Sequence, residues 1–358
     1  MEKIAGKDLR PGMVLGADTY VANGQVLFPV GTVLDDEKIN RLVYHSIELV
    51  EIAEESSGIR GGGALSHDSY FEGIRESSAF LDYEELFEKT RNEFRKECAR
   101  IIEEDTPIAL DRMLQMVETL LHAAEKSGGV LHVLHSMNGY DDESYAHCLN
   151  VSLLANQLAT WAGYNRTEVE MAMLSGLFHD IGKTKIPESV LRKKGRLTEG
   201  ERRLVQRHTV EGFQILQKQK VDMHIKNAVL LHHERMDGSG YPMGLKGPQI
   251  DLYARLIAIV DVYDAITSPR VYRAALCPYT AISLIEEEGI NKYDSKLIHI
   301  FLEHVIDTYK DYPVRLSNGE SARVVKIQKE GYARPLVKAG NRFYDLLEKK
   351  ELKIVDIM

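Results

Sequence analysis

The 358-residue sequence is poor in cysteine and has no excess of positive charge. Its three cysteines, Cys98, Cys148 and Cys277, are odd in number and unpaired in spacing, which argues against a disulfide framework and favours a reducing compartment. The 45 Lys and Arg residues are outnumbered by 54 Asp and Glu residues, so the formal net charge is −9. This charge balance gives no indication of a basic surface for duplex nucleic acid or an anionic membrane, so we expect neither as a partner.

Long apolar runs are also lacking. The first residues, MEKIAGKDLRPGM, contain no apolar core of the signal-peptide kind. No uninterrupted apolar run approaches the roughly 18 residues that a membrane span needs. We therefore expect no membrane span and a cytoplasmic protein. The apolar fraction of 44% and charged fraction of 28% are ordinary for a globular protein with a buried core.

The N-terminal part of the chain divides into three stretches. Residues 1–54 are predicted to form a small β-rich accessory unit, because β-prone runs flank Asn23-Gly24, a hairpin signal, and one short helix follows. The Gly- and Ser-rich residues 55–66 are typical of a linker. Residues 67–129 are predicted to be a helical connecting segment. Its apolar stripe is expected to pack against the next domain, with a homodimer contact through 78–126 as the alternative.

Residues 130–312 have the pattern of helices joined by short loops, and residues 313–358 return to strand patterns around a second Asn-Gly turn at Asn318-Gly319. The expected fold class is therefore mostly α. An all-helical bundle forms the core, with a small β-rich unit at the N-terminus and a small β extension at the C-terminus.

Histidines and carboxylates recur at the edges of apolar helices in the helical region. In LSGLFHDIGKTKIP, an apolar helix reaches His179 and Asp180 just before Gly182 and Pro187 break it. Burying an imidazole and a carboxylate at such a helix end is unfavourable unless they are paired or bind a metal. Taken alone, this stretch is also compatible with a buried His–Asp hydrogen bond.

Other stretches repeat this layout. Glu143 and His147 lie four residues apart, so both can point from one helical face. His208 follows a helix that starts with a capping box from Thr198 to Glu201. The apolar helix NAVLLHHE delivers two adjacent histidines, and an apolar run in ARLIAIVDVYDAITS precedes two aspartates one turn apart, namely His232, His233, Asp261 and Asp264.

Five imidazoles with several carboxylates exceed the ligands of one tetrahedral zinc, so they predict a cluster of two or more metals, with a carboxylate such as Asp180 bridging. Nitrogen and oxygen ligands without thiolates favour iron, manganese, nickel or zinc. Two metals about 3.5–4 Å apart suit the in-line displacement of a phosphoryl group. Lys183, Arg270 and Arg273 are candidate phosphate-binding cations beside this cluster.

The motifs HDIGK, HHERMDGSGYP and DVYDAITSPRVYR occur in one order that resembles the HD-GYP family, part of the HD-domain superfamily of metal-dependent phosphohydrolases. The resemblance covers roughly residues 130–312 and rests on HD at 179–180, HHE at 232–234 and GYP at 240–242. It implies an HD-GYP catalytic domain that hydrolyses cyclic di-GMP, a bacterial second messenger, to the linear dinucleotide, to GMP or to both.

The resemblance also implies roles for particular residues. It implies that Asp180 and Lys183 are catalytic, that Lys183, Arg270 and Arg273 hold the scissile phosphate, and that Tyr241 lies in a substrate-facing loop. The implied cofactors are two or three divalent transition-metal ions, with iron or manganese favoured over nickel or zinc. The implied metal ligands are Glu143, His147, His179, Asp180, His208, His232, His233 and Asp261.

Two positions depart from the family pattern, Thr209 and Val271, which stand where the family often has proline. Two alternative functions are a non-catalytic module that senses a cyclic dinucleotide or docks a partner, and an HD phosphohydrolase acting on another nucleotide. Nucleotide binding at unchanged affinity after removal of the metal ligands would favour the first alternative. Hydrolysis of other nucleotides with cyclic di-GMP left intact would favour the second.

Overall fold

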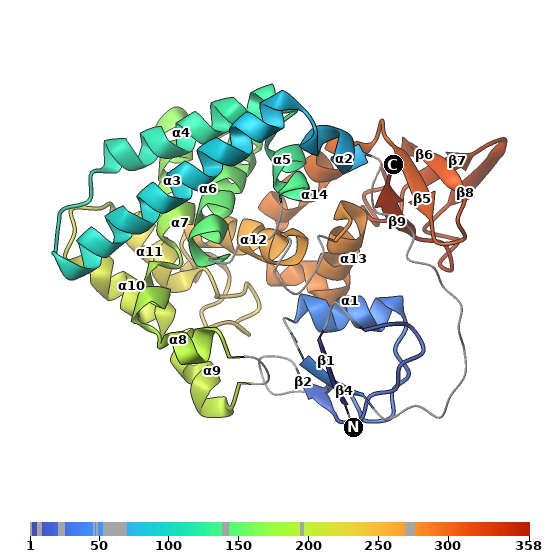
Figure 1. Cartoon of the computed structure of the whole chain (residues 1–358), viewed down its shortest axis with the longest axis horizontal. Coiled ribbons are helices and arrows are strands. Elements are labelled where there is room, and N and C mark those ends of the chain that lie inside the picture. Colours follow the sequence, from blue (N-terminus) through green and yellow to red (C-terminus); the bar gives the residue numbers. More distant parts are fainter. Residues whose placement is uncertain are drawn as a thin grey trace.

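The computed structural model shows a chain built mainly from α-helices, with small β units at its two ends (Figure 1). It describes residues 2–5, 9–20, 26–45, 47, 49–52, 70–137, 143–193, 197–268 and 276–358. The predicted mostly α fold class is confirmed. Across these described residues, no helix combines the length and apolar character needed to cross a membrane.

The N-terminal unit has its own small core. Its two antiparallel strand pairs and one helix are β1 (Glu2–Ala5) with β4 (Leu49–Ile52), β2 (Thr19–Tyr20) with β3 (Val26–Phe28), and α1 (Asp36–Tyr44). Leu15, Leu34 and Leu42 are buried between these elements. The predicted hairpin pairing of β2 with β3 is confirmed, whereas its Asn23-Gly24 turn lies outside the described residues.

The connecting helices pack onto the main bundle. They are α2 (Tyr70–Arg75), α3 (Ser78–Glu103) and α4 (Leu110–Lys126). Ser77 caps α3 by accepting a hydrogen bond from the Phe80 backbone N–H. The α3 side chains Phe87 and Phe94 are buried, and Phe94 lies 6.2 Å from the ring of Phe178. The apolar stripe therefore packs within the chain, as predicted.

The bundle continues with α5 (Val130–Ser136), α6 (Glu143–Trp161), α7 (Arg166–Phe178), η2 (Ile181–Lys185), α8 (Glu188–Leu191), α9 (Glu199–Gln206), α10 (His208–Gln217), α11 (Met223–Leu231), η3 (Gly247–Gln249), α12 (Leu252–Thr267), α13 (Pro278–Gly289), η4 (Ile290–Lys292) and α14 (Ser295–Tyr309). Helix α12 is buried on nearly every side, as expected for a helix that is apolar around its circumference. Helices α6 and α7 approach closely at Gly176, where a Cβ would lie 2.9 Å from Ser152 Cα. Side chains at the ends of these helices are thereby brought together in the interior.

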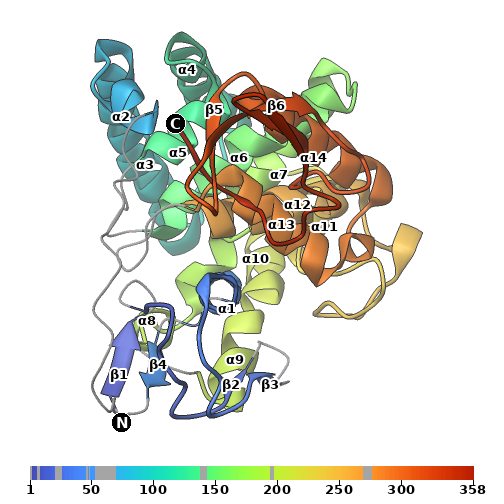
Figure 2. The ribbon, with the colours of Figure 1, turned by 90° about the vertical axis from the view of Figure 1, so that its right-hand side faces the viewer.

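The C-terminal extension is a five-stranded antiparallel sheet in the order β8-β7-β6-β5-β9. Its strands are β5 (Pro313–Leu316), β6 (Ser321–Lys326), β7 (Leu336–Ala339), β8 (Arg342–Asp345) and β9 (Ile354–Ile357). Helix α13 lies between this sheet and α1 (Figure 1), and Figure 2 shows the sheet covering one side of the bundle.

Carboxylates on α13 contact both terminal units. Glu286 accepts hydrogen bonds from the backbone N–H groups of Tyr332 (2.6 Å) and Ala333 (3.3 Å). Glu288 Oε1 lies 3.1 Å from His45 Nε2 of the N-terminal unit. The exact boundaries of the domains stay a prediction.

Candidate metal centre

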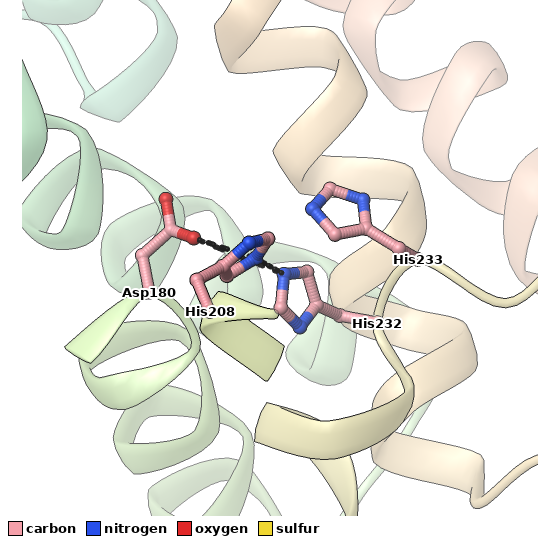
Figure 3. A group of neighbouring side chains, drawn as sticks. All are labelled: Asp180, His208, His232 and His233. Carbon is pink, nitrogen blue, oxygen red and sulfur yellow. Dashed lines mark hydrogen bonds and ion pairs between the residues drawn. The ribbon is translucent and has the colours of Figure 1, made fainter. Parts of the chain in front are cut away.

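Seven of the predicted site side chains converge inside the helical bundle. They come from helix ends or from the middle of buried helices: His147 from α6, His179 and Asp180 directly after α7, His208 at the start of α10, His232 and His233 directly after α11, and Asp261 from α12. Their ligand atoms form two groups, one of Asp180, His208, His232 and His233 (Figure 3), the other of His147, His179 and Asp261.

The backbone around the HD pair is unusually close to α10. A Cβ on Gly182 would lie 1.9 Å from the His208 carbonyl oxygen and 2.4 Å from the Gly212 nitrogen, so only glycine fits there. This close approach brings the start of η2, and with it Asp180, next to His208. The glycine of the HD motif therefore has a packing reason as well as a helix-ending one.

Asp180 lies between the two groups. Its Oδ2 is 3.3 Å from His179 Nε2 and 3.6 Å from His147 Nε2, which belong to one group. Its Oδ1 is 3.3 Å from His208 Nε2 and 3.9 Å from His232 Nε2, which belong to the other. Each oxygen of one carboxylate thus faces a different set of imidazoles, which is the arrangement of a bridging ligand.

Three imidazoles are each oriented by the backbone carbonyl of the residue three positions earlier in the chain. The Nδ1 atoms of His179, His208 and His232 contact the carbonyl oxygens of Gly176 (2.7 Å), Val205 (2.7 Å) and Val229 (3.0 Å). Since a carbonyl can only accept, Nδ1 carries the proton in each ring, and the lone pair of Nε2 points into the centre. Such an anchored ring nitrogen is the usual partner arrangement of a metal-binding histidine.

The inward-facing nitrogens of the imidazoles lie within hydrogen-bond distance of one another. His147 Nε2 lies 3.2 Å from His179 Nε2, and His208 Nε2 lies 3.4 Å from His232 Nε2. At least one Nε2 of the second pair has no proton to share, because both rings use Nδ1 as the donor. Among the described residues, the buried Asp180 Oδ1 also lacks a hydrogen-bond donor. These donors fit divalent metal ions.

The charge states follow the burial and the pairing of each group. Burial lowers the pKa of His232 to about 3, and burial also lowers the pKa of His208. Burial lowers the pKa of His147 as well, but its hydrogen bonds with Asp261 and Asp264 raise that pKa to about 9. The neutral imidazoles of His208 and His232 are in the protonation state that metal ligation requires, whereas a metal would have to displace a proton from His147.

The two carboxylates of the centre are held in the ionised form. Burial opposes ionisation of Asp180, but the positive charge of Lys183 holds its pKa well below the usual range. Burial also opposes ionisation of Asp261, but its hydrogen bond with His147 outweighs burial and holds its pKa well below the usual range. Lys183 Nζ donates to Asp180 Oδ2, and the side chain remains 28% exposed, so it can face a ligand that enters from solvent.

The loop after His233 folds back over the centre. The ring of Tyr241 stacks on His233 at a centroid distance of 4.7 Å and an interplanar angle of 28°. Burial raises the pKa of the Tyr241 hydroxyl above its usual value, so the hydroxyl stays protonated at neutral pH. Whether this side chain contacts a substrate, as predicted, stays a prediction.

Three predicted site residues fall outside what the structure describes. Arg270 and Arg273 lie in residues 269–275, and the side chain of Glu143, at the start of α6, is likewise outside the described part. Their predicted roles in phosphate binding and metal binding stay predictions. Of the two departures from the family pattern, Val271 lies in the same stretch, whereas Thr209 is buried and its hydroxyl donates to the Gln206 carbonyl oxygen at 3.1 Å.

Sequence reasoning did not assign two buried carboxylates that support the site. Asp264 Oδ2 accepts a hydrogen bond from His147 Nδ1 at 2.7 Å, and Ser268 Oγ donates to Asp264 Oδ1 at 2.6 Å. Glu234 accepts hydrogen bonds from the loop after it. Asp264 was visible as the aspartate one turn beyond Asp261, and Glu234 as a carboxylate beside two histidines, but neither spacing reveals a partner.

A buried bridging aspartate between two sets of imidazoles defines a candidate dinuclear metal site in an α-helical bundle. The model of the HD domain family matches residues 109–297, more than half of the chain, and the chain belongs to this family. The predicted resemblance is therefore confirmed. The matched range contains both groups of candidate ligands.

Named relatives are similar to about half of the chain. A Pseudomonas aeruginosa protein, cyclic di-GMP phosphodiesterase PA4108, is 37% identical over 199 residues, which are 55% of this chain and 48% of the relative. The Vibrio cholerae 3'3'-cGAMP-specific phosphodiesterase 1 is 35% identical over 168 residues, 47% of this chain and 39% of the relative. The chain thus spans about half or less of the length of these two relatives.

A solved structure of the Bdellovibrio bacteriovorus HDG"Y"P protein Bd1817 aligns with 85% of this chain and 99% of its own. Its sequence identity is 17% and the TM-score is 0.48.

Proposed function

We propose that this chain is a metal-dependent phosphodiesterase that hydrolyses cyclic di-GMP in bacterial second-messenger signalling. The observation that carries the proposal is the carboxylate of Asp180, whose two oxygens face two separate sets of imidazoles. Two divalent ions in such a site supply an activated water at neutral pH and positive charge against phosphate oxygens. The names of two relatives supply the class of substrate, a cyclic dinucleotide.

The residues of the centre would have distinct roles in metal binding and in stabilising charge. His147, His179 and Asp261 would hold one ion, His208, His232 and His233 the other, and Asp180 would bridge them. Lys183 keeps a positive charge at the edge of the centre, because the attraction of Asp180 outweighs burial and raises its pKa. It would stabilise a phosphate oxygen or the leaving oxygen as the P–O bond breaks.

The metals proposed are iron or manganese, with nickel or zinc as alternatives, since every candidate ligand is nitrogen or oxygen. A third ion would require Glu143, and Arg270 with Arg273 would bind the scissile phosphate. Changing Glu143 to Gln should lower the metal content or change the ratio of linear dinucleotide to GMP. An unchanged metal count and an unchanged product ratio would remove Glu143 from the site.

The direct test is hydrolysis by purified protein loaded with a defined metal. We expect cyclic di-GMP to be converted to the linear dinucleotide or GMP, as identified by mass spectrometry, and Asp180→Ala to abolish turnover with loss of bound metal. Retained binding of cyclic di-GMP by metal-loaded protein without any product would instead identify a non-catalytic sensor.

A second candidate substrate is 3'3'-cGAMP, favoured by the relative with that specificity. Competition between the two cyclic dinucleotides in one reaction compares their kcat/KM values directly. A preference for 3'3'-cGAMP would replace the substrate in the proposal and leave the metal chemistry unchanged.

A further inference from the structure

We propose that Glu234 is a positioning residue, which fixes residues 235–245 over His233 and so shapes the wall that a nucleotide meets beside the metal centre. That the substrate is a nucleotide rests on the proposed function, whereas the position of the loop rests on the structure. Residues 235–245 are called the capping loop below. Glu234 follows the two histidines directly, so it stands at the root of this loop.

The carboxylate of Glu234 is an acceptor for three successive backbone N–H groups. Oε1 accepts from Met243 at 2.6 Å and from Gly244 at 3.0 Å, and Oε2 accepts from Leu245 at 3.0 Å. The residue is only 2% exposed, so these charge-assisted bonds form away from the screening of bulk water. One side chain thus ties the far end of the capping loop to its beginning.

The near side of the loop is closed by backbone contacts. The Tyr241 N–H donates to the His233 carbonyl oxygen at 3.2 Å. At Gly240 a Cβ would lie 2.4 Å from both Glu234 Cα and the His233 carbonyl oxygen, so the chain passes where only glycine fits. The loop therefore packs directly against His233, a candidate metal ligand, and against Glu234.

The result is a fixed place for the aromatic ring and an exposed tip beside it. Tyr241 stacks on His233, while Pro242 and Met243, which come next, are exposed. Met243, 63% exposed, is the residue whose N–H is held most closely by Glu234. The anchor lies behind the surface that a bound nucleotide would contact, and it acts on that surface through the loop.

Glu234 is not a further metal ligand in this arrangement. Both of its oxygens are occupied by loop amides, and the two groups of candidate ligands among the described residues do not include it. A change that disturbs the loop should therefore alter recognition of a large substrate while the ions stay in place.

The decisive variant is Glu234→Gln, which keeps the size of the side chain but turns one acceptor oxygen into a donor that opposes a loop N–H. We expect the KM for cyclic di-GMP to rise by about tenfold, because hydrogen bonds to a charged group are lost. Metal content should match the wild type. Hydrolysis of bis(4-nitrophenyl) phosphate, a small diester with no base, should change by less than about twofold, since the metal ligands themselves are untouched.

A second measurement does not depend on turnover. Hydrogen–deuterium exchange of the metal-loaded protein should show the amides of residues 243–245 protected in the wild type and exchanging faster in Glu234→Gln. Glu199→Gln is the matched control, because it makes the same change at an exposed carboxylate of α9, outside the capping loop, that accepts a hydrogen bond from Arg202 at 2.8 Å. This control should leave exchange at 243–245 and the KM unchanged.

Gly240→Ala disturbs the contact of the loop backbone with His233 and Glu234. It is the variant to use if Glu234→Gln fails to fold. It should give the same pattern of faster exchange and higher KM with unchanged metal content. Wild-type exchange and wild-type KM in a folded, metal-loaded variant would overturn the proposal. If the wild type hydrolyses no cyclic dinucleotide, the proposed function fails, and the exchange of 243–245 alone then decides whether Glu234 holds the loop.

Discussion

At the scale of single residues, Asp264 is the side chain that fixes His147. It is buried, accepts a hydrogen bond from His147 Nδ1 and is itself oriented by a hydrogen bond from Ser268 Oγ. Removing such a partner from a metal-binding histidine typically weakens metal affinity about 10–100-fold. We therefore expect Asp264→Asn to lose bound metal in competition with a chelator at concentrations that leave the wild type loaded.

The matched control for that experiment is Asp251→Asn. Asp251 precedes the same helix, α12, and its Oδ2 lies 2.7 Å from His224 Nδ1, so it has the same type of contact away from the centre. Its metal affinity should equal that of the wild type. Equal chelator sensitivity of the two variants would show that the contact with His147 does not support metal binding.

Protonation of His147 should make metal binding depend on pH. The pKa of this imidazole in the metal-free protein is raised to about 9, since its hydrogen bonds with Asp261 and Asp264 outweigh burial. A metal must displace the proton, so affinity should rise as pH increases from 7 towards 9, with proton release on binding. Calorimetry in buffers of different ionisation enthalpy measures that proton.

The same pKa has an opposite effect on the stability of the metal-free protein. A histidine whose folded-state pKa lies above the unfolded value of 6.5 stabilises the fold below that value, and this contribution disappears as pH rises through about 9. Denaturant unfolding in the presence of a chelator should therefore show lower stability at pH 9 than at pH 7, and His147→Asn should lessen the difference. A flat profile in the wild type would contradict the assigned charge.

Residue types and helix positions could be predicted at this scale, but hydrogen-bond partners could not. Apolar runs and breakers correctly place His179 and Asp180 at the end of α7, whereas Asp261, expected at a helix edge, lies inside α12. That Asp264 meets a histidine 117 residues earlier in the chain depends on how α6 packs on α12, which no local period encodes.

At the scale of elements, the approach of η2 to α10 depends on Gly182. An alanine there would place Cβ against backbone atoms of His208 and Gly212, which cannot move aside as a side-chain tip could. Overpacking of this kind usually destabilises by about 1–3 kcal/mol and shifts the backbone. We expect Gly182→Ala to lower the thermal midpoint and to reduce the metal content, because Asp180 and His208 flank the contact.

Gly200→Ala provides the comparison. Gly200 lies in α9 with no atom within 4 Å of a Cβ placed on it, so alanine should raise helix stability by roughly 0.5–1 kcal/mol. Its thermal midpoint should be equal to or above that of the wild type, with full metal content. A similar loss in both variants would refute the close-contact explanation.

Element boundaries were well marked in the sequence where caps and breakers are local. The Thr198 to Glu201 capping box forms, and α7 ends at Phe178, directly before the HD pair. A second capping box, at Asn165 and Glu168, starts α7. The η2 turn after Asp180 was not distinguishable from a loop, since its geometry depends on the contact with α10.

At the scale of the whole molecule, α13 joins the two terminal units to the bundle. Glu286 binds two backbone N–H groups of the C-terminal extension, and Glu288 contacts His45 of the N-terminal unit. The short helix η4, directly after α13, contacts the capping loop, because the Met236 N–H donates to the Lys292 carbonyl oxygen at 2.9 Å. None of these contacts could be predicted, because they join segments far apart in sequence, through the side chains of Glu286 and Glu288 and through the backbone of Met236 and Lys292.

Loss of the Glu286 carboxylate should loosen the C-terminal extension. Glu286→Ala leaves the N–H groups of Tyr332 and Ala333 without this acceptor, and an unsatisfied group of this kind costs about 1–3 kcal/mol. We expect faster amide exchange in residues 331–346 with little change in metal content. Exposed Glu287→Ala on the same helix is the control, and equal exchange in the two variants would contradict the role of Glu286 as an anchor.

The shared position of Asp180 makes the two halves of the centre interdependent. An ion held by one set of imidazoles would draw on the same negative charge that the other set needs, so the affinity for a second ion would depend on the presence of the first. Titrating metal-free protein should therefore give two stepwise binding constants whose ratio differs from that expected for two independent sites. Partial occupancy in a purified sample would then reflect the order in which the ions enter, and the metal supplied first would influence which metal completes the pair.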